Sequence, residues 1–506
     1  MLVSDLTRSD KRSKSATYLI GAGLCASFAL FFFQHRSPAS LWLLIVAAML
    51  AWLCLDLAVA LLPLTFPYYH DLLPLVAGGS RAFSLNELGI CMCVGAALLR
   101  FLVLPEEWRV TRAWIQTLLQ QGRPMFLAAL LLLLASSLAL LVSPDRPASL
   151  HAYRQQIIEP LLYFLLVLCY IRTRADVARM SGSLVISVVI AACFGIAQGL
   201  LHITTGLLIV SPTTFRVDGP YPGPNSLAFL FDRTLPILLA LLLPGLFRRP
   251  TARGFAWRDP LRWGCLVALV PLVWALYWTD SRGAEVALLT VFLLLLIFEV
   301  RHRLVVLVAA GVGAVGMGLF WSRVIRLFNV PGHGLLSERL LLWKAGWLMI
   351  RDSFWLGSGL NSFNTRYRPD APQSYALKAL NGQAFPTDYS PNLLHPHNFL
   401  LDFWISSGLP GVLALAWLLW AFATILVRTH HLCAGLRQGH VLQRLLIGIA
   451  GSMLAGLIHG LVDNFYFAPD LAMIFWLFMG VVLVVQNIAR REQDAGARDS
   501  SAQQQV

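Results

Sequence analysis

Residues 124–143 read PMFLAALLLLLASSLALLVS, an apolar stretch without a charged side chain. A helix rises about 1.5 Å per residue, so this run is long enough to cross the hydrocarbon core of a bilayer, which is about 30 Å thick. Further apolar runs lie at 17–35, 40–65, 84–104, 156–172, 183–204, 225–247, 263–279, 283–300, 303–321, 398–427, 444–463 and 470–489. The sequence therefore predicts an all-α polytopic membrane protein.

The composition excludes a soluble globular domain. Of 506 residues, 58% are hydrophobic and 13% are charged, and the mean hydropathy is +0.68. The long continuous runs lack the alternation that an outer-membrane barrel needs. The eight cysteines lie in or beside apolar runs and have no neighbouring ligands, so they predict neither a zinc site nor a disulfide framework.

The arginines predict which loops share a side of the membrane, because positive charge is retained on the cytoplasmic side. The clearest cytoplasmic loop is 248–262, with Arg248, Arg249, Arg253, Arg258 and Arg262. Alternation then places 172–179, 301–303, 428–444 and 490–491 on that side, and 205–224, 280–282 and 322–397 outside. Counting all the runs puts the basic N-terminus on the wrong side, so we expect about 12 transmembrane helices and a miscounted or re-entrant piece within 17–104.

The chain divides into five predicted parts. These are a cytoplasmic tail at 1–16, N-terminal transmembrane helices at 17–205, a candidate catalytic region at 206–465, a last transmembrane helix at 466–491 and a disordered cytoplasmic tail at 492–506. The catalytic region contains the loop 322–397, which is too long for a plain connector. Helical spacing of apolar residues at 337–352 predicts that part of this loop forms a helical cap, which Gly357-Ser-Gly359 should end.

The end of this loop holds two imidazoles, in His395-Pro-His397-Asn398, ten residues before Gly408-Leu-Pro-Gly411. Imidazole can take and give a proton near neutral pH, so this stretch indicates acid–base chemistry. A histidine at a helix start can equally serve as a cap or as an interfacial polar residue.

Two arginines fall on the same predicted face. Arg216 precedes Pro224-Asn225, and Arg282 stands in the short turn Asp280-Ser281-Arg282-Gly283. Guanidinium groups bind phosphate well, and the loop 322–397 also carries excess positive charge. Snorkelling, a salt bridge to a nearby aspartate or contact with lipid headgroups would explain these charges without a ligand.

These residues resemble the O-antigen ligase and polymerase group of bacterial surface-glycan enzymes. His397-Asn398, nine residues and Gly408-Leu-Pro-Gly411 are similar to the family's periplasmic histidine motif. Arg216 with Pro224-Asn225, the turn Ser281-Arg282-Gly283, and Arg339, Trp343 and Gly357-Ser-Gly359 resemble its other conserved segments. The resemblance covers about 210–465, and the doubled imidazole departs from the motif, so that only spacing favours His397 over His395.

The resemblance implies an inverting, metal-independent glycosyltransferase of the bacterial inner membrane, with its site facing the periplasm and with no cofactor. His397 would be the general base, and Arg216, Arg282 and Arg339 would bind the diphosphate of an undecaprenyl diphosphate-linked glycan. Asn225, Asn398 and His395 would support them. The acceptor would be the lipid A core for a ligase, a second lipid-linked glycan for a polymerase, or a protein hydroxyl, and the sequence leaves these open.

A transporter of lipid-linked glycans is the alternative of another class, although no internal repeat supports it. Four other polar candidates lie within the apolar runs. Asp402 is expected to be exposed at a helix end, Glu159 and Asp232 to pair with buried arginines, and His459 to lie near the site or outside it. Asp463 lies near the same face, and the sequence assigns it no role.

Overall fold

A computed structural model describes most of the chain. The described residues are 14–34, 40–70, 73–74, 82–203, 216–247, 259–299, 311, 335–386, 390–391, 393–436 and 438–503. The predicted run 303–321 lies almost wholly outside them.

The described part is helical, apart from one antiparallel pair of two-residue strands, β1 (Leu73–Pro74) and β2 (Ala82–Phe83). The first half holds α2 (Lys14–Gln34), α3 (Ser40–Leu53), α4 (Leu55–Leu61), the 3₁₀ helix η1 (Leu62–Tyr68), α5 (Leu85–Val103), α6 (Pro105–Gln121), α7 (Arg123–Val142), α8 (Arg146–Tyr153), the π-helical turn η2 (Arg154–Ile158), α9 (Glu159–Tyr170) and α10 (Arg174–Leu201). The second half holds α11 (Pro224–Asp232), α12 (Leu235–Phe247), α13 (Pro260–Thr279), α14 (Arg282–Glu299), α16 (Leu335–Asp352), α17 (Phe363–Tyr367), α18 (Tyr375–Ala379), α19 (Phe399–Ala434), α20 (His440–Gly460) and α21 (Pro469–Gln503).

Nine helical segments of the described chain are long and apolar enough to cross a membrane, or up to ten if a bent pair counts as one span. This confirms the all-α polytopic prediction but not the count of 12. The bent pair replaces the run predicted at 40–65: α3 and the segment Leu55–Tyr68 meet at 118°. The helix breaks at Cys54, and Pro63 and Pro67 disfavour α-helix in the segment that follows. The irregular piece expected within 17–104 is therefore this broken segment.

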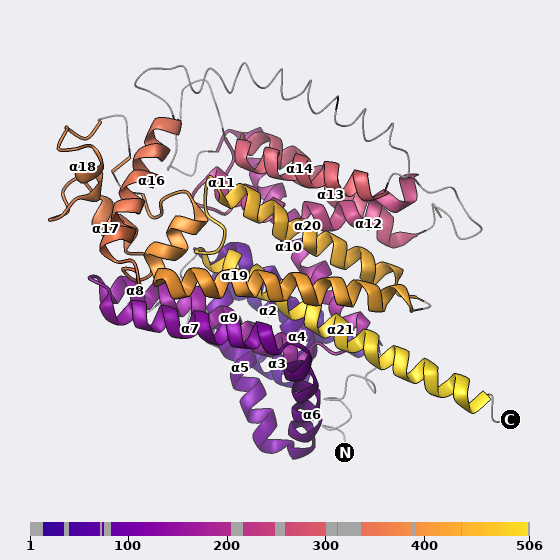
Figure 1. Cartoon of the computed structure of the whole chain (residues 1–506). Coiled ribbons are helices and arrows are strands. Elements are labelled where there is room, and N and C mark those ends of the chain that lie inside the picture. The colour runs from indigo at the N-terminus through magenta and orange to yellow at the C-terminus, as the bar shows by residue number, and fades with distance from the viewer. Residues whose placement is uncertain are drawn as a thin grey trace.

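The last helix is the axis of the bundle. The apolar part of α21 is buried throughout, and α21 packs against α9 and α19 (Figure 1). The helix does not end where a disordered tail was expected, because it continues to Gln503. Arg174 at the start of α10 pairs with Glu492 and also donates to the backbone oxygen of Gln438, so three segments predicted to share the cytoplasmic side do lie together.

The predicted partly helical cap is present, and the cap is here defined as residues 335–386 (Figure 1). Its helices α16, α17 and α18 enclose a separate apolar core that includes Leu342, Met349, Phe363 and Tyr375. Ile405 of α19 belongs to the same core, which fixes the cap to the bundle. Helix α16 ends at Asp352, before the glycine turn that was expected to end it.

The cap docks where α19 is broken. Gly408 interrupts α19 with φ 65° and ψ −170°, a conformation open essentially to glycine alone. The break lets Ser358 N–H donate to the oxygen of Ile405 at 2.6 Å and Leu409 N–H donate to that of Phe354 at 3.2 Å. Gly357, with φ 70°, touches the backbone at Gly408. The two glycine motifs noted in the sequence therefore form one backbone-to-backbone joint.

Gly408→Ala should open this joint. A Cβ at Gly408 would lie 2.2 Å from the oxygen of Trp355, and the backbone strain adds to this clash. We expect a loss of about 2 kcal/mol or more, read as a lower midpoint of thermal unfolding in detergent with faster proteolysis of the cap. Gly182→Ala on α10 is the matched control, because its Cβ would meet nothing within 4 Å. Equal midpoints for the two variants would contradict the joint.

Candidate functional site

His397 is held by the turn that starts α19. Its backbone is left-handed, with φ 50°, and the next residue caps the helix: the side-chain oxygen of Asn398 accepts from the N–H groups of Leu400 and Leu401, both at 3.1 Å. The amide of Asn398 also donates to the oxygen of Leu461 at 2.9 Å. Asn398 thus positions the turn, and it joins α19 to the segment after α20.

That segment supplies the partner of His397, the buried carboxylate of Asp463. His397 Nδ1 lies 2.9 Å from Asp463 Oδ1, and Asn225 Nδ2 donates to Asp463 Oδ2 at 2.7 Å. The backbone N–H of Asn464 donates to Oδ1 at 2.9 Å. Burial alone would raise the pKa of Asp463, but His397 and the other positive neighbours hold that pKa well below its usual range. Asp463 is therefore an anion at the centre of the site.

His395 lies against the same carboxylate. Its Nε2 is 3.9 Å from Asp463 Oδ1, its Nδ1 accepts from the N–H of His397 at 3.3 Å, and the two imidazole rings are 4.4 Å apart. Burial, together with the charges of His397 and Arg339, lowers the pKa of His395 to about 3. The second imidazole therefore stays neutral near pH 7 and supports the turn.

The same three side chains are a candidate metal-ligand group within the described residues. His395, His397 and Asp463 each offer one ligand atom, and these atoms lie within 4.8 Å of one another. Imidazole and carboxylate are ligands that Zn²⁺ accepts. The positive charge of the nearby arginines disfavours a bound cation, whereas the three side chains themselves are suitable metal ligands.

Of the three arginines singled out in the sequence, Arg339 lies near Asp463 and Arg216 is joined to it through Asn225. Arg216 Nε donates to the oxygen of Thr279 at 2.7 Å, and its Nη2 donates to Asn225 Oδ1 at 3.1 Å and to the oxygen of Asp280 at 3.2 Å. Arg282 begins α14 just after that turn. Burial, together with the charge of Arg282, lowers the pKa of Arg216. Arg339 of α16 reaches to 3.9 Å from Asp463 Oδ2.

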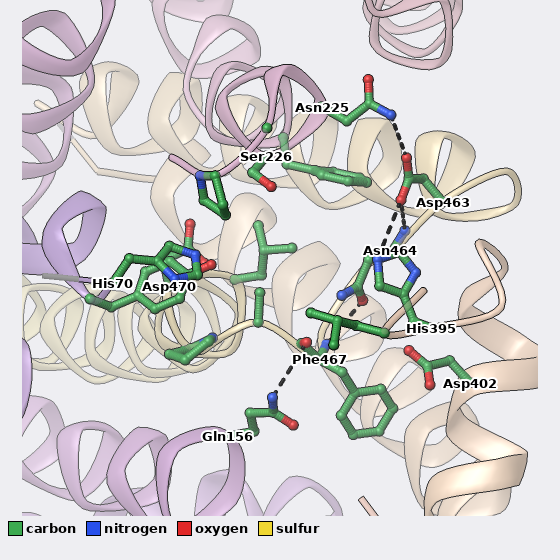
Figure 2. Close-up of a pocket in the computed structure, with 18 of the residues that line it drawn as sticks. His70, Gln156, Asn225, Ser226, His395, Asp402, Asp463, Asn464, Phe467 and Asp470 are labelled. Carbon is green, nitrogen blue, oxygen red and sulfur yellow. Dashed lines mark hydrogen bonds and ion pairs between the residues drawn. The ribbon is translucent and has the colours of Figure 1, made fainter. Parts of the chain in front are cut away.

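A cavity of about 470 Å³, here called the site cavity, opens beside these groups (Figure 2). Arg216, Asn225, His395, His397 and Asp463 line it. Further lining comes from His151, Gln155 and Gln156 of α8 and η2, from Asp402 and Ser406 of α19, and from Asn464, Phe467 and residues 468–471 around the start of α21. The sequence-predicted residues on the cavity thus come from separate parts of the chain.

A larger and mostly apolar cavity of about 900 Å³, here called the apolar cavity, adjoins the site cavity. Its walls are side chains of α2, α4, η1, α5 and α10, among them Phe28, Phe32 and Phe194. His70 and Pro222 line both cavities. A polar chamber and an apolar chamber therefore meet at these two residues.

The other polar residues have clear positions. Asp402 is buried, with 5% of its surface exposed, so the expectation of an exposed helix end is wrong. Glu159 pairs with Arg154 at 3.6 Å, as expected. Asp232 pairs with His459 at 2.6 Å instead of an arginine, and that imidazole stacks on Phe229 with ring centres 3.9 Å apart.

The sequence assigns Asp463 no role because a single aspartate after a helix belongs to no recognisable motif. The one signal in the sequence is its position, three residues after the end of α20 and three before the aromatic pair Tyr466-Phe467, on the face predicted to hold the histidines.

Comparison with known proteins gives one family match: the family model described as O-antigen ligase matches residues 267–416. The matched range includes Arg282, Arg339, His397 and Gly408. No curated protein matches the chain.

Asp463→Ala should destabilise the protein strongly. It would leave the partly buried donors of His397 and Asn225 and the buried N–H of Asn464 without their acceptor, at a cost of about 1–3 kcal/mol for a buried unpaired group. Thermal unfolding in detergent measures the change. Asp370→Ala removes a carboxylate from an exposed pair with Arg368 and should leave the midpoint where it is. Equal midpoints for the two variants would mean that Asp463 does not hold the site together.

Proposed function

We propose that this chain is a member of the O-antigen ligase and polymerase family and that it moves a glycan from undecaprenyl diphosphate to an acceptor hydroxyl. The observation that carries the proposal is the contact between His397 and Asp463 on the wall of a cavity that Arg216 also lines. A base and an anion-binding group therefore face one space. The site would face the periplasm from the bacterial inner membrane, where the predicted topology puts loops 205–224, 280–282 and 322–397.

His397 is the proposed general base. Its Nδ1–H donates to Asp463, which leaves Nε2 free to accept a proton. The acceptor hydroxyl oxygen attacks the anomeric carbon, its proton passes to Nε2, and the bond from that carbon to the diphosphate oxygen breaks with its electrons going to the diphosphate. Attack from the face opposite the leaving group inverts the anomeric centre. Asp463 stabilises the imidazolium that forms, as the aspartate of a catalytic triad does.

Arg216, Arg282 and Arg339 are the proposed diphosphate ligands. Their positive charge would offset the charge that develops on the leaving group, which is the task a metal ion performs in other transferases. Arg216 is already fixed by backbone oxygens of the 279–280 turn, so little reorganisation is needed at that position. Asn225 is hydrogen-bonded to both Arg216 and Asp463, and so it fixes the position of the anion-binding arginine relative to the partner of the base.

The apolar cavity suits the polyprenyl tail of the donor. It meets the site cavity at His70 and Pro222, so a diphosphate beside Arg216 can have its tail among the aromatic side chains of α2 and α10. Such a tail is insoluble in water and gains free energy from each apolar contact.

The acceptor separates the two enzymatic alternatives. Transfer to a lipid A core sugar defines a ligase, and transfer to a second lipid-linked glycan defines a polymerase of O-antigen or exopolysaccharide. A transporter would need no base, so the pairing of His397 with a buried carboxylate favours transfer over transport.

Purified protein should transfer glycan from a synthetic undecaprenyl diphosphate donor in the presence of EDTA, because guanidinium groups replace the metal. His397→Ala should lower the rate by about 10²- to 10⁴-fold, the usual contribution of a general base. His395→Ala should keep most of the activity, since His395 supports the turn without touching substrate. Product is measured on a lipid A core acceptor and, separately, as lengthened lipid-linked glycan.

Full activity of His397→Ala would refute the assigned base. Loss of wild-type activity in EDTA, restored by Zn²⁺, would instead make His395, His397 and Asp463 metal ligands. Donor binding without transfer to any acceptor would favour transport.

A bulky residue in the apolar cavity should discriminate donors by tail length. Ala29→Trp on α2 would fill part of the cavity and should raise the KM for the undecaprenyl donor while leaving the KM for a two-isoprene donor unchanged. Ala22→Trp, exposed on the same helix outside the cavity wall, is the matched control. Equal effects of Ala29→Trp on both donors would place the tail elsewhere.

A further inference from the structure

Three buried oxygen atoms on residues that line the site cavity have no hydrogen-bond partner. They are Gln156 Oε1, Asp402 Oδ2 and Asp470 Oδ1. Asp402 and Asp470 expose 5% and 2% of their surfaces. Leaving such an atom unpaired costs about 1–3 kcal/mol, so three on the lining of one cavity indicate that something else supplies the missing bonds.

The chemistry of these atoms selects the ligand. Among the described residues that line the site cavity, each buried and unpaired side-chain atom is a carboxylate or amide oxygen, and none is a nitrogen donor. A diphosphate offers only oxygen acceptors, so it cannot pair with the amide oxygen of Gln156 or with the acceptor oxygen of a carboxyl group. Sugar hydroxyls are donors and can pair with all three.

The hydrogen bonds that these side chains already make leave their three acceptor oxygens unused. Asp402 Oδ1 accepts only a long bond of 3.5 Å from the hydroxyl of Ser406. Asp470 Oδ2 accepts from the hydroxyl of Tyr221 at 3.0 Å, which fixes the carboxylate and leaves Oδ1 unused. The amide nitrogen of Gln156 donates to the oxygen of Phe467 at 3.4 Å, and this bond orients the free oxygen. Asp402 and Gln156 are thus placed by neighbours that line the cavity, and Asp470 by Tyr221.

The three residues stand apart from the anion-binding groups. In Figure 2 Asp402 lies at the end of the cavity near His395, Asp470 lies beside His70 at the other end, and Gln156 lies below, on the side away from Asn225. They come from α19, α21 and the π-helical turn η2, a type of turn that is frequent at functional sites. The lining therefore has a cationic side at Arg216 and a side of acceptors.

We propose that Gln156, Asp402 and Asp470 form a saccharide subsite that accepts hydrogen bonds from sugar hydroxyls. The subsite rests on the proposed function, and it deepens that function by separating sugar recognition from diphosphate recognition within one cavity. Asp402, at the end of the cavity that holds the imidazoles, binds the sugar nearest the reaction.

Binding to purified full-length protein in detergent tests the subsite. The probes are bare undecaprenyl diphosphate, the same lipid carrying a disaccharide, and a lipid A core glycolipid. Asp402→Asn keeps the shape of the side chain but replaces an acceptor by a donor, and Gln156→Met removes the oxygen. We expect each variant to bind a sugar-bearing probe about tenfold or more weakly and to bind bare undecaprenyl diphosphate as the wild type does. Asp494→Asn, exposed near the far end of α21, is the matched control.

The probes also locate the sugar. Weaker binding of the disaccharide lipid assigns the subsite to the donor glycan, and weaker binding of the core glycolipid assigns it to the acceptor. Unchanged binding of both sugar-bearing probes by both variants overturns the proposal. An equal loss of binding to bare undecaprenyl diphosphate also overturns the proposal, because it would show that the residue serves lipid binding or the fold. The midpoint of thermal unfolding distinguishes these two roles. These measurements need no transfer, so failure of the proposed activity is seen separately in the wild-type assay.

Discussion

The site depends on one buried anion, the carboxylate of Asp463. An isolated carboxylate is costly to bury, and the cost is offset here by three short contacts, from His397, Asn225 and the backbone of Asn464. These contacts come from the turn before α19, from the start of α11 and from the segment before α21. Arg339 of the cap faces the same carboxylate. One negative charge thus sets the relative positions of four separate parts of the chain.

The surroundings of this anion divide the space by chemistry. Arg216 forms a cationic side. The unpaired oxygens of Asp402, Asp470 and Gln156 form a side of hydrogen-bond acceptors, and the apolar cavity adjoins at His70. An amphiphile with a charged linker, a hydroxyl-rich head and an apolar tail has the same three parts in the same molecule. Burial makes each match stronger than it would be in water, because the local dielectric is low.

Much of this arrangement could be predicted from the sequence. Apolar runs predict membrane helices because the bilayer imposes a minimum length on them. His397, Arg216 and Arg282 lie in short local motifs, which can be recognised without knowledge of the fold. Asp463 and Asp402 could not be found in this way, since their importance lies in burial and in partners distant in sequence. The break between α3 and α4 was hidden for a related reason: composition reports how apolar a run is, and a bend of 118° leaves the composition unchanged.

The two imidazoles of the site differ in their surroundings. Both rings face Asp463, but burial and the neighbouring positive charges keep His395 neutral, whereas His397 makes the short contact of 2.9 Å. In the proposed transfer the proton of the acceptor hydroxyl passes to His397, beside the carboxylate of Asp463. The arginines proposed as diphosphate ligands would offset the negative charge of the leaving group. Two opposite charges can form in one small cavity because each arises beside a fixed partner that was present before the reaction.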